Sequence, residues 1–321
     1  MGRLLIWVFV LVMLVAGWVG ACVVYQAAEM GARVGPLEPR QFDRFTLVAV
    51  GTGGPYENPA RGGPCMATGL GSRIVLVDAG RAVAEGLRAA KIPVSQPDTV
   101  LLTHLLPENT VGLDDLLFAG WLGGRDRPLR VIGPVGTQAL VDGLLAGYAA
   151  TIAAQGDALG LREAGSRIEV EEVGDGWSEE RDGLALRAGA LPGGPTAALA
   201  WRIAAGGRSV VVSGTGWSDD ALVAFSDGSD VLVHEAIYVP TPADMEAAGI
   251  VDVDLDLLRR EEALHTSILE VGALAERTGV ETLVLVRMRP PPMFDIQVTG
   301  ELRKHFSGGI WIPDDGDELE P

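Results

Sequence analysis

Residues 99–109 read TVLLTHLLPEN and join a short apolar run to a loop that carries ionisable side chains. The run TVLLT at 99–103 has the length and the β-branched content of a buried strand. His104 follows it directly, and Glu108 and Asn109 come shortly after. The stretch therefore predicts a buried strand whose end presents an imidazole and a carboxylate, and Glu108 is a candidate general base.

Similar runs recur on both sides of this stretch, separated by turn residues and by segments with helical spacing. We expect strands at 45–50, 66–70, 73–77, 129–132, 167–173, 184–188, 198–203, 209–213, 231–234, 282–287 and 309–312. We expect helices at 82–90, 137–154, 219–225 and 258–278. Glycine-containing turns at 71–72 and 206–207 predict two hairpins. Clusters of strands with intervening helices, repeated in the second half, predict two sheets with helices outside them, in one domain at 45–321.

The composition describes a folded and acidic chain. It has 321 residues and a formal net charge of −18, from 43 acidic and 25 basic residues. An excess this acidic repels phosphate backbones and disfavours nucleic acid as a partner. With 48% hydrophobic residues the chain is not largely disordered. Two cysteines and four histidines tightly limit any metal site built from these residue types.

The N-terminus carries a membrane segment. Residues 4–25 hold no charge, and a stretch of this length can cross roughly 30 Å of hydrocarbon as a helix. Arg3 precedes it, which predicts a cytoplasmic N-terminus and a domain on the extracytoplasmic, periplasmic side. The segment Val19-Gly20-Ala21-Cys22 also resembles a lipobox that would lipidate Cys22, and cleavage as a signal segment is a third alternative. We expect a membrane anchor or signal segment at 1–25 and a polar linker at 26–44.

A set of short motifs between residues 45 and 315 resembles the metallo-β-lactamase fold, in particular its ribonuclease Z and arylsulfatase-like branch. In chain order the motifs are GTG at 51–53, RGGPC at 61–65, LVDAG at 76–80, LTH at 102–104, GLDDL at 112–116, IGPVGT at 132–137, VSG at 212–214, DVLVHEA at 230–236, HTS at 265–267 and LVL at 283–285. The ordered set carries the resemblance. It implies an α/β fold, an αβ/βα sandwich of two mixed β-sheets with the active site at the edge where both sheets end.

The resemblance also implies zinc chemistry. Active members hold two zinc ions, and a zinc-bound hydroxide attacks a phosphoryl or carbonyl centre. Their ligands come from a His-x-His-x-Asp-His loop, a later His, an Asp that bridges the metals and a final His. The corresponding positions here are His104, Leu106, Glu108, Asn109, Pro192, Thr215 and Arg287. Only the first of these keeps the residue of the family pattern.

The replacements oppose a metal ion. Leu106 and Pro192 offer no donor atom, and the guanidinium of Arg287 stays charged at any ordinary pH. A unit charge and a dication at ~4 Å repel each other by about 8 kcal/mol at an effective dielectric near 20. We therefore predict no metal ligands, and we interpret Arg287 as a cation that pairs with Glu108 in the space left by zinc. Asp78, in LVDAG, keeps the role that the resemblance implies, which is to support the ligand loop.

Two further motifs contribute histidines. His265 resembles the family's helper histidine near the scissile group, and we interpret it, like His104, as a remnant of the old cleft. His234 and Glu235 end a strand, where packing and hydrogen bonding are the expected roles. A mononuclear zinc site from His104, Glu108 and His265 is the alternative.

Two functions follow from these residues. The favoured interpretation is a membrane-tethered, non-catalytic homologue that uses no cofactor and binds an unknown small molecule or protein at the old cleft. The alternative is a metal-dependent hydrolase of esters, sulfates or phosphodiesters, similar to ribonuclease Z, with an atypical or mononuclear zinc site. Processing of tRNA 3′ ends is opposed by the membrane segment, the net charge and the missing ligands.

Overall fold

The computed structural model describes residues 2–54, 58, 60–194, 196–214, 219–237, 254–262, 265–289 and 295–321. The chain separates into two units, Met1–Glu38 and Pro39–Pro321.

The N-terminal unit is one helix, α1 (Gly2–Val34). Its segment Phe9–Ala27 has a mean hydropathy of 2.1 and is, within the described residues, long and apolar enough to cross a membrane. Membrane anchors and signal sequences share these properties. The helix continues through residues 26–34, where the sequence predicted a polar linker, because this stretch contains good helix formers and no proline.

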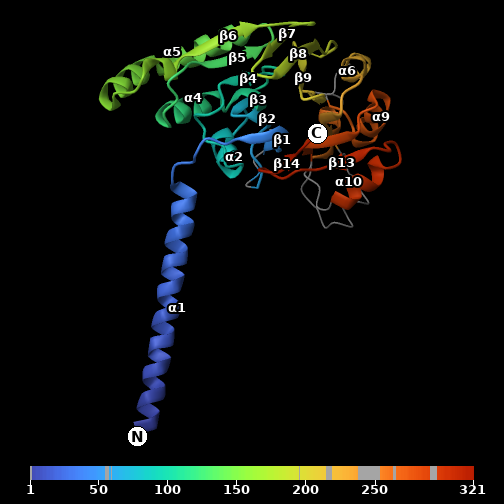
Figure 1. Ribbon diagram of the computed structural model, residues 1–321. Coiled ribbons are helices and arrows are strands. Elements are labelled where there is room, and N and C mark those ends of the chain that lie inside the picture. The colour runs from blue at the N-terminus through green and yellow to red at the C-terminus, as the bar shows by residue number, and fades with distance from the viewer. Residues whose placement is uncertain are drawn as a thin grey trace. The chain divides into compact units, whose positions relative to one another are not determined.

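The second unit contains two sheets, each of seven strands among the residues described (Figure 1). The first sheet has the order β14-β1-β2-β3-β4-β5-β6 and the second has the order β13-β12-β11-β10-β9-β8-β7. The strands of the first are β1 (Phe42–Gly51), β2 (Cys65–Gly71), β3 (Arg73–Val77), β4 (Thr99–Leu101), β5 (Leu129–Gly133), β6 (Ile168–Glu172) and β14 (Glu318–Leu319). Those of the second are β7 (Ser178–Arg181), β8 (Leu184–Ala190), β9 (Leu199–Ala205), β10 (Arg208–Val212), β11 (Val231–Ile237), β12 (Thr282–Arg289) and β13 (Gly309–Trp311). The predicted pair of mixed sheets is confirmed.

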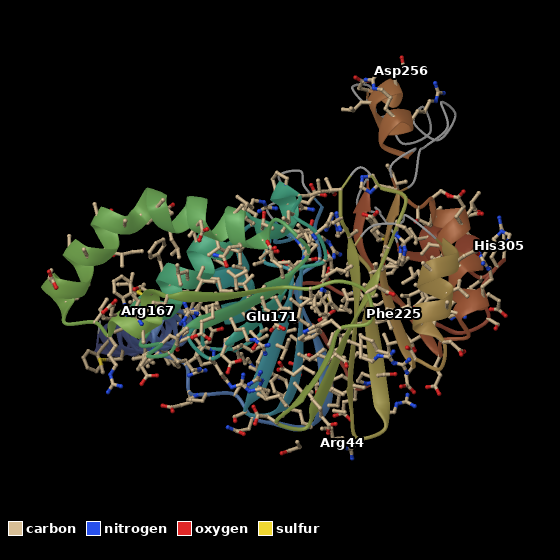
Figure 2. All side chains as sticks on the ribbon, turned by 90° about the horizontal axis from the view of Figure 1, so that it is seen from above. Arg44, Arg167, Glu171, Phe225, Asp256 and His305 are labelled. Atoms are coloured by element: carbon tan, nitrogen blue, oxygen red, sulfur yellow. The ribbon has the colours of Figure 1, made fainter. Side chains whose placement is uncertain are left out.

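Helices α2 (Val83–Ala89), α4 (Leu113–Leu122), α5 (Thr137–Leu159), α6 (Asp219–Ser226), α9 (Ile268–Thr278) and α10 (Asp295–Leu302) pack on the sheets. The other described helices are α3 (Pro107–Thr110), the exposed α8 (Leu255–Glu262) and a short 3₁₀ helix, η1 (Glu163–Ser166). One apolar cluster joins the first sheet to α2, α4 and α5, and another joins the second sheet to α6, α9 and α10. Charged side chains such as Arg44 and Arg167 lie at the periphery (Figure 2).

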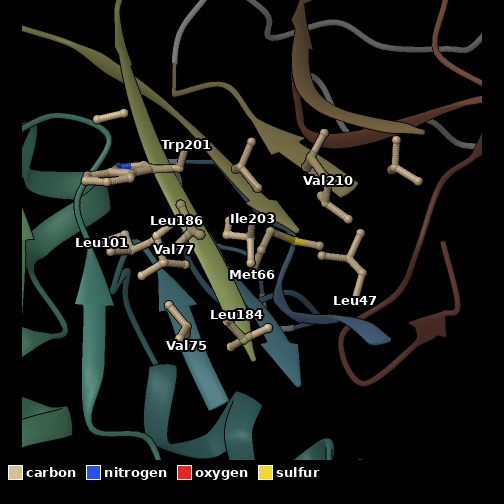
Figure 3. Close-up of a cluster of buried hydrophobic side chains, with 14 of the residues drawn as sticks. Leu47, Met66, Val75, Val77, Leu101, Leu184, Leu186, Trp201, Ile203 and Val210 are labelled. Carbon is tan, nitrogen blue, oxygen red and sulfur yellow. The ribbon is translucent and has the colours of Figure 1, made fainter. Parts of the chain in front are cut away.

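The central core lies between the two sheets (Figure 3). Leu47, Met66 and Val77 come from the first sheet and meet Trp201 and Ile203 from the second. Trp201 is fully buried, and its Nε1 donates a hydrogen bond to the carbonyl oxygen of Leu102, 3.0 Å away. This bond joins β9 of the second sheet to the end of the strand that carries the candidate site.

One predicted helix, at 258–278, is wrong. The chain forms α8 and α9 instead, and Ser267 begins α9 with a capping box in which its side chain and that of Glu270 each accept a bond from the other's backbone. An N-cap residue takes an extended backbone conformation, so Ser267 interrupts the helix that was predicted to run through it. Strands β7 and β14 were not predicted, because their sequences SEER and EL lack an apolar alternation.

Candidate functional site

The loop after β4 is held in place by a buried carboxylate. Asp78 follows β3 with a left-handed backbone, φ 64°. Its Oδ1 accepts a 2.8 Å bond from the backbone amide of Thr103, and its Oδ2 accepts from Thr103 Oγ1 at 2.8 Å and from Asn109 Nδ2 at 2.7 Å. Burial raises the pKa of Asp78 to about 6, although these bonds oppose the shift. Asp78 therefore supports the loop as expected, and Asn109 turns toward it.

His104 lies fully buried at the end of this network. The single hydroxyl proton of Thr103 is donated to Asp78, so its oxygen accepts from Nδ1 of His104 at 2.8 Å. The other ring nitrogen, Nε2, has no hydrogen-bond partner among the residues described. Burial, with a smaller contribution from Arg287, lowers the pKa of His104 to about 3. The imidazole is thus neutral at ordinary pH.

A β-bulge directs Arg287 into the site. In the β11–β12 pairing, Glu235 lies opposite Val286 and Ile237 lies opposite Arg289, so one residue of β11 faces two of β12. Arg287 is the first of these two and has φ 56°. Its backbone amide leaves the strand ladder and donates to the carbonyl oxygen of Thr52 at 2.7 Å. Bulges of this kind bend a strand and redirect a side chain.

The guanidinium of Arg287 contacts two carboxylates. Its Nη2 lies 2.7 Å from Glu108 Oε1 and 3.5 Å from Glu235 Oε2, and its Nη1 donates to the carbonyl oxygen of Gly214. The arginine side chain is 3% exposed. The Glu108–Arg287 pair that the sequence predicted is therefore present.

Glu235 also binds His265. Its Oε1 lies 2.7 Å from His265 Nδ1, and the two side chains are 2% and 10% exposed. Burial alone would raise the pKa of Glu235, but Arg287 and His265 outweigh it and lower the pKa to about 2. We call Glu108, Glu235, His265 and Arg287 the Arg287 cluster. The sequence placed Glu235 at a strand end but did not predict its contact with the arginine.

The residues at this site do not fit a dinuclear zinc centre. Leu106 is half-buried and Pro192 is exposed, and neither has a donor atom. Within the described ranges, no group of three or more His, Cys, Asp or Glu residues is arranged to hold a metal ion. Arg287 places a permanent cation between the two carboxylates. Thr215, the position of the bridging Asp, lies outside the described residues.

The mononuclear alternative meets part of the same difficulty. Glu108, one of its three donors, is paired with Arg287. His104 and His265 are bonded through Nδ1 to Thr103 and Glu235, which is an arrangement that zinc-bound histidines share and that does not oppose a metal.

Solved structures share this architecture. The metallo-β-lactamase fold protein YhfI from Bacillus subtilis superposes with a TM-score of 0.65 at 19% identity, over 86% of this chain and 99% of its own. The short form of human tRNase Z gives 0.62 at 17% identity, over 86% and 99%. At these identities the likeness defines the fold alone, which is that of a metallo-β-lactamase.

Sequence relatives identify the family. No family model matches the chain. The ribonuclease Z of Mycobacterium bovis (strain BCG / Pasteur 1173P2) is 31% identical over 287 residues, which cover 85% of this chain and 97% of the relative. The ribonuclease Z of Mycobacterium tuberculosis (strain ATCC 25618 / H37Rv) is 30% identical over the same shares. The chain therefore belongs to the ribonuclease Z family.

Removal of the central cation should destabilise the fold. Arg287→Ala leaves Glu108 and the buried Glu235 without their guanidinium, and breaking a buried ion pair costs about 3–5 kcal/mol. Urea unfolding should show this loss in the free energy of unfolding. The matched control is Arg44→Ala, which removes an exposed pair with Glu320 and should cost less than about 1 kcal/mol. Equal effects of the two variants would contradict the assigned role.

The neutral His104 gives a pH prediction. The unfolded chain protonates this group near its ordinary pKa of 6.5, whereas the folded chain does so only near 3. The unfolded state therefore binds the extra proton as the pH falls below 6.5, and stability decreases by at most about 1.4 kcal/mol per pH unit down to the folded value. His104→Gln should remove this part of the slope, measured by urea unfolding across that window. His305→Gln, which changes an exposed histidine (Figure 2), should keep the wild-type slope. A wild-type slope in His104→Gln would contradict the prediction.

Proposed function

We propose that this chain is a non-catalytic member of its family that binds a ligand at the Arg287 cluster without a metal ion. The observation that carries the proposal is the guanidinium of Arg287 between Glu108 and Glu235. In zinc hydrolases the metal supplies both the Lewis acid and the attacking hydroxide. A fixed cation bonded to two carboxylates can balance their charge, but it cannot supply that hydroxide.

The N-terminal helix supports a membrane tether as part of this function. Its apolar span of 19 residues matches the thickness of a bilayer core. Arg3 at its start favours an extracytoplasmic position for the domain. If the segment is processed at Cys22, a lipid on that residue would serve as the membrane anchor instead. The binding site would then act at the outer face of the membrane.

A second candidate is a hydrolase similar to ribonuclease Z. It is favoured by the 30–31% identity to ribonuclease Z proteins over 85% of the chain. Three features of the site also fit a hydrolase. They are the hydrogen bonds from Thr103 and Asn109 to Asp78, the position of His104 and the His265–Glu235 bond. Such an activity requires a metal set that includes residues outside the described part of the chain. The two candidates differ in zinc content.

Zinc content and turnover should separate the two candidates. The full-length chain, purified in detergent with zinc present, should contain far less than one zinc per chain by elemental analysis. Hydrolysis of bis(4-nitrophenyl) phosphate should not exceed that of a blank. Mycobacterium tuberculosis ribonuclease Z, treated in parallel, is the reference for a relative of known type.

Near-stoichiometric zinc that is lost in His104→Ala would overturn the proposal, as would turnover that is abolished by His265→Ala. His305→Ala, at an exposed position, is the matched control for both variants.

A further inference from the structure

Residues 313–317 lie against the loop that follows β1. Strand β14 pairs with β1 (Figure 1). Just before β14, the amide of Gly316 donates to the carbonyl oxygen of Ala49 at 2.7 Å, and the amide of Ala49 donates to the carbonyl oxygen of Asp317 at 2.9 Å. These bonds place segment 313–317 beside the GTG motif at 51–53, to which the proposed function assigns no role.

Asp315 of this segment binds two loops at once. Its Oδ1 accepts from the amide of Thr52 at 2.9 Å and from the Thr52 hydroxyl at 2.8 Å, and its Oδ2 accepts from the amide of Gly62 at 2.5 Å. Gly62 belongs to the RGGPC motif at 61–65. Arg61 of the same motif donates from Nη1 to the Thr52 hydroxyl oxygen at 2.6 Å. Three donors on one carboxylate hold the two motifs at a fixed separation.

Glycines let the two motifs approach this closely. A Cβ on Gly51 would lie 1.9 Å from the carbonyl oxygen of Gly63, and one on Gly53 would lie 2.7 Å from the carbonyl oxygen of Gly62. Both distances are too short for a non-bonded contact, so a larger residue at either position would push the loops apart. The amide of Gly53 donates to the Gly62 oxygen at 2.8 Å. The GTG and RGGPC motifs therefore form one unit, to which Asp315 is bonded.

Thr52 in turn holds the backbone of Arg287. Its carbonyl oxygen accepts the Arg287 amide that has left the strand ladder at the bulge, where Arg287 has φ 56°. A buried amide without an acceptor is costly, and a residue other than glycine keeps a left-handed conformation only where its surroundings hold it. Loss of the bulge would change the direction of the Arg287 side chain and move its guanidinium away from Glu108 and Glu235.

We propose that Asp315 is a positioning residue for Arg287 and acts through Thr52. Its carboxylate fixes Thr52, Thr52 accepts the Arg287 amide, and the bulge directs the guanidinium to Glu108. Segment 313–317 and the GTG motif are thereby parts of the site. The inference concerns how the arginine is held and does not rest on the proposed ligand binding.

NMR of the full-length chain in detergent, with isotope-labelled arginine and a chelator present, tests the inference. Arg287→Lys identifies the Arg287 signals. In Asp315→Ala the Arg287 amide should exchange with heavy water at least about tenfold faster. The separate Nη signals of the bonded guanidinium should merge, because its rotation is no longer hindered. The amide of Arg202, in the central strand β9 of the same sheet, should keep its rate and thus report an intact fold.

Asp314→Ala is the matched control, because this neighbouring carboxylate is 78% exposed and pairs with Arg61 at the surface. It should leave the Arg287 signals unchanged. A second pair of variants needs no change in segment 313–317. Thr52→Val removes the hydroxyl that donates to Asp315 and should accelerate exchange of the Arg287 amide, whereas Thr52→Ser keeps the hydroxyl and should not.

Unchanged Arg287 signals in Asp315→Ala would overturn the inference, as would equal effects of the two aspartate variants or of the two Thr52 variants. Equal acceleration at Arg202 would also overturn it, since the effect would then be a general loss of stability. The chelator keeps these results independent of the zinc assay, so the failure of one proposal can be told from the failure of the other.

Discussion

The guanidinium of Arg287 lies between the carboxylates of Glu108, in α3 after a strand of the first sheet, and Glu235, in strand β11 of the second sheet. Buried carboxylates remain ionised only if a positive charge or hydrogen-bond donors compensate for their lost hydration. In a zinc enzyme of this fold the metal would supply that charge. Here one side chain supplies it from within the chain, and the protonation states of the neighbouring groups depend on it.

The arginine reaches this position because of the backbone around it. The bulge in β12 and the bond from the Arg287 amide to Thr52 place its side chain at the edge where the sheets end. The Asp78 network orders the loop after β4 through hydrogen bonds to Thr103 and Asn109. These contacts are made by the chain's own residues, so they can order the loop after β4 and the end of β12.

The sequence predicted much of this arrangement. Apolar runs identified most strands, and the motif positions identified Glu108 and Arg287 as a pair. The contact between Arg287 and Glu235 could not be predicted, because it depends on a bulge that strand periodicity does not reveal. The break before Ser267 was also missed, since the helical spacing at 258–278 outweighed the signal of Ser267 and Glu270 as a capping box. Polar edge strands such as β7 carry no apolar pattern.

The most direct test is a crystal structure of the chain grown with zinc, with diffraction data recorded on both sides of the zinc absorption edge. We expect no anomalous peak near His104, and density for the Arg287 guanidinium close to the carboxylates of Glu108 and Glu235. A strong anomalous peak coordinated by His104 or His265, with the Arg287 side chain displaced, would contradict it.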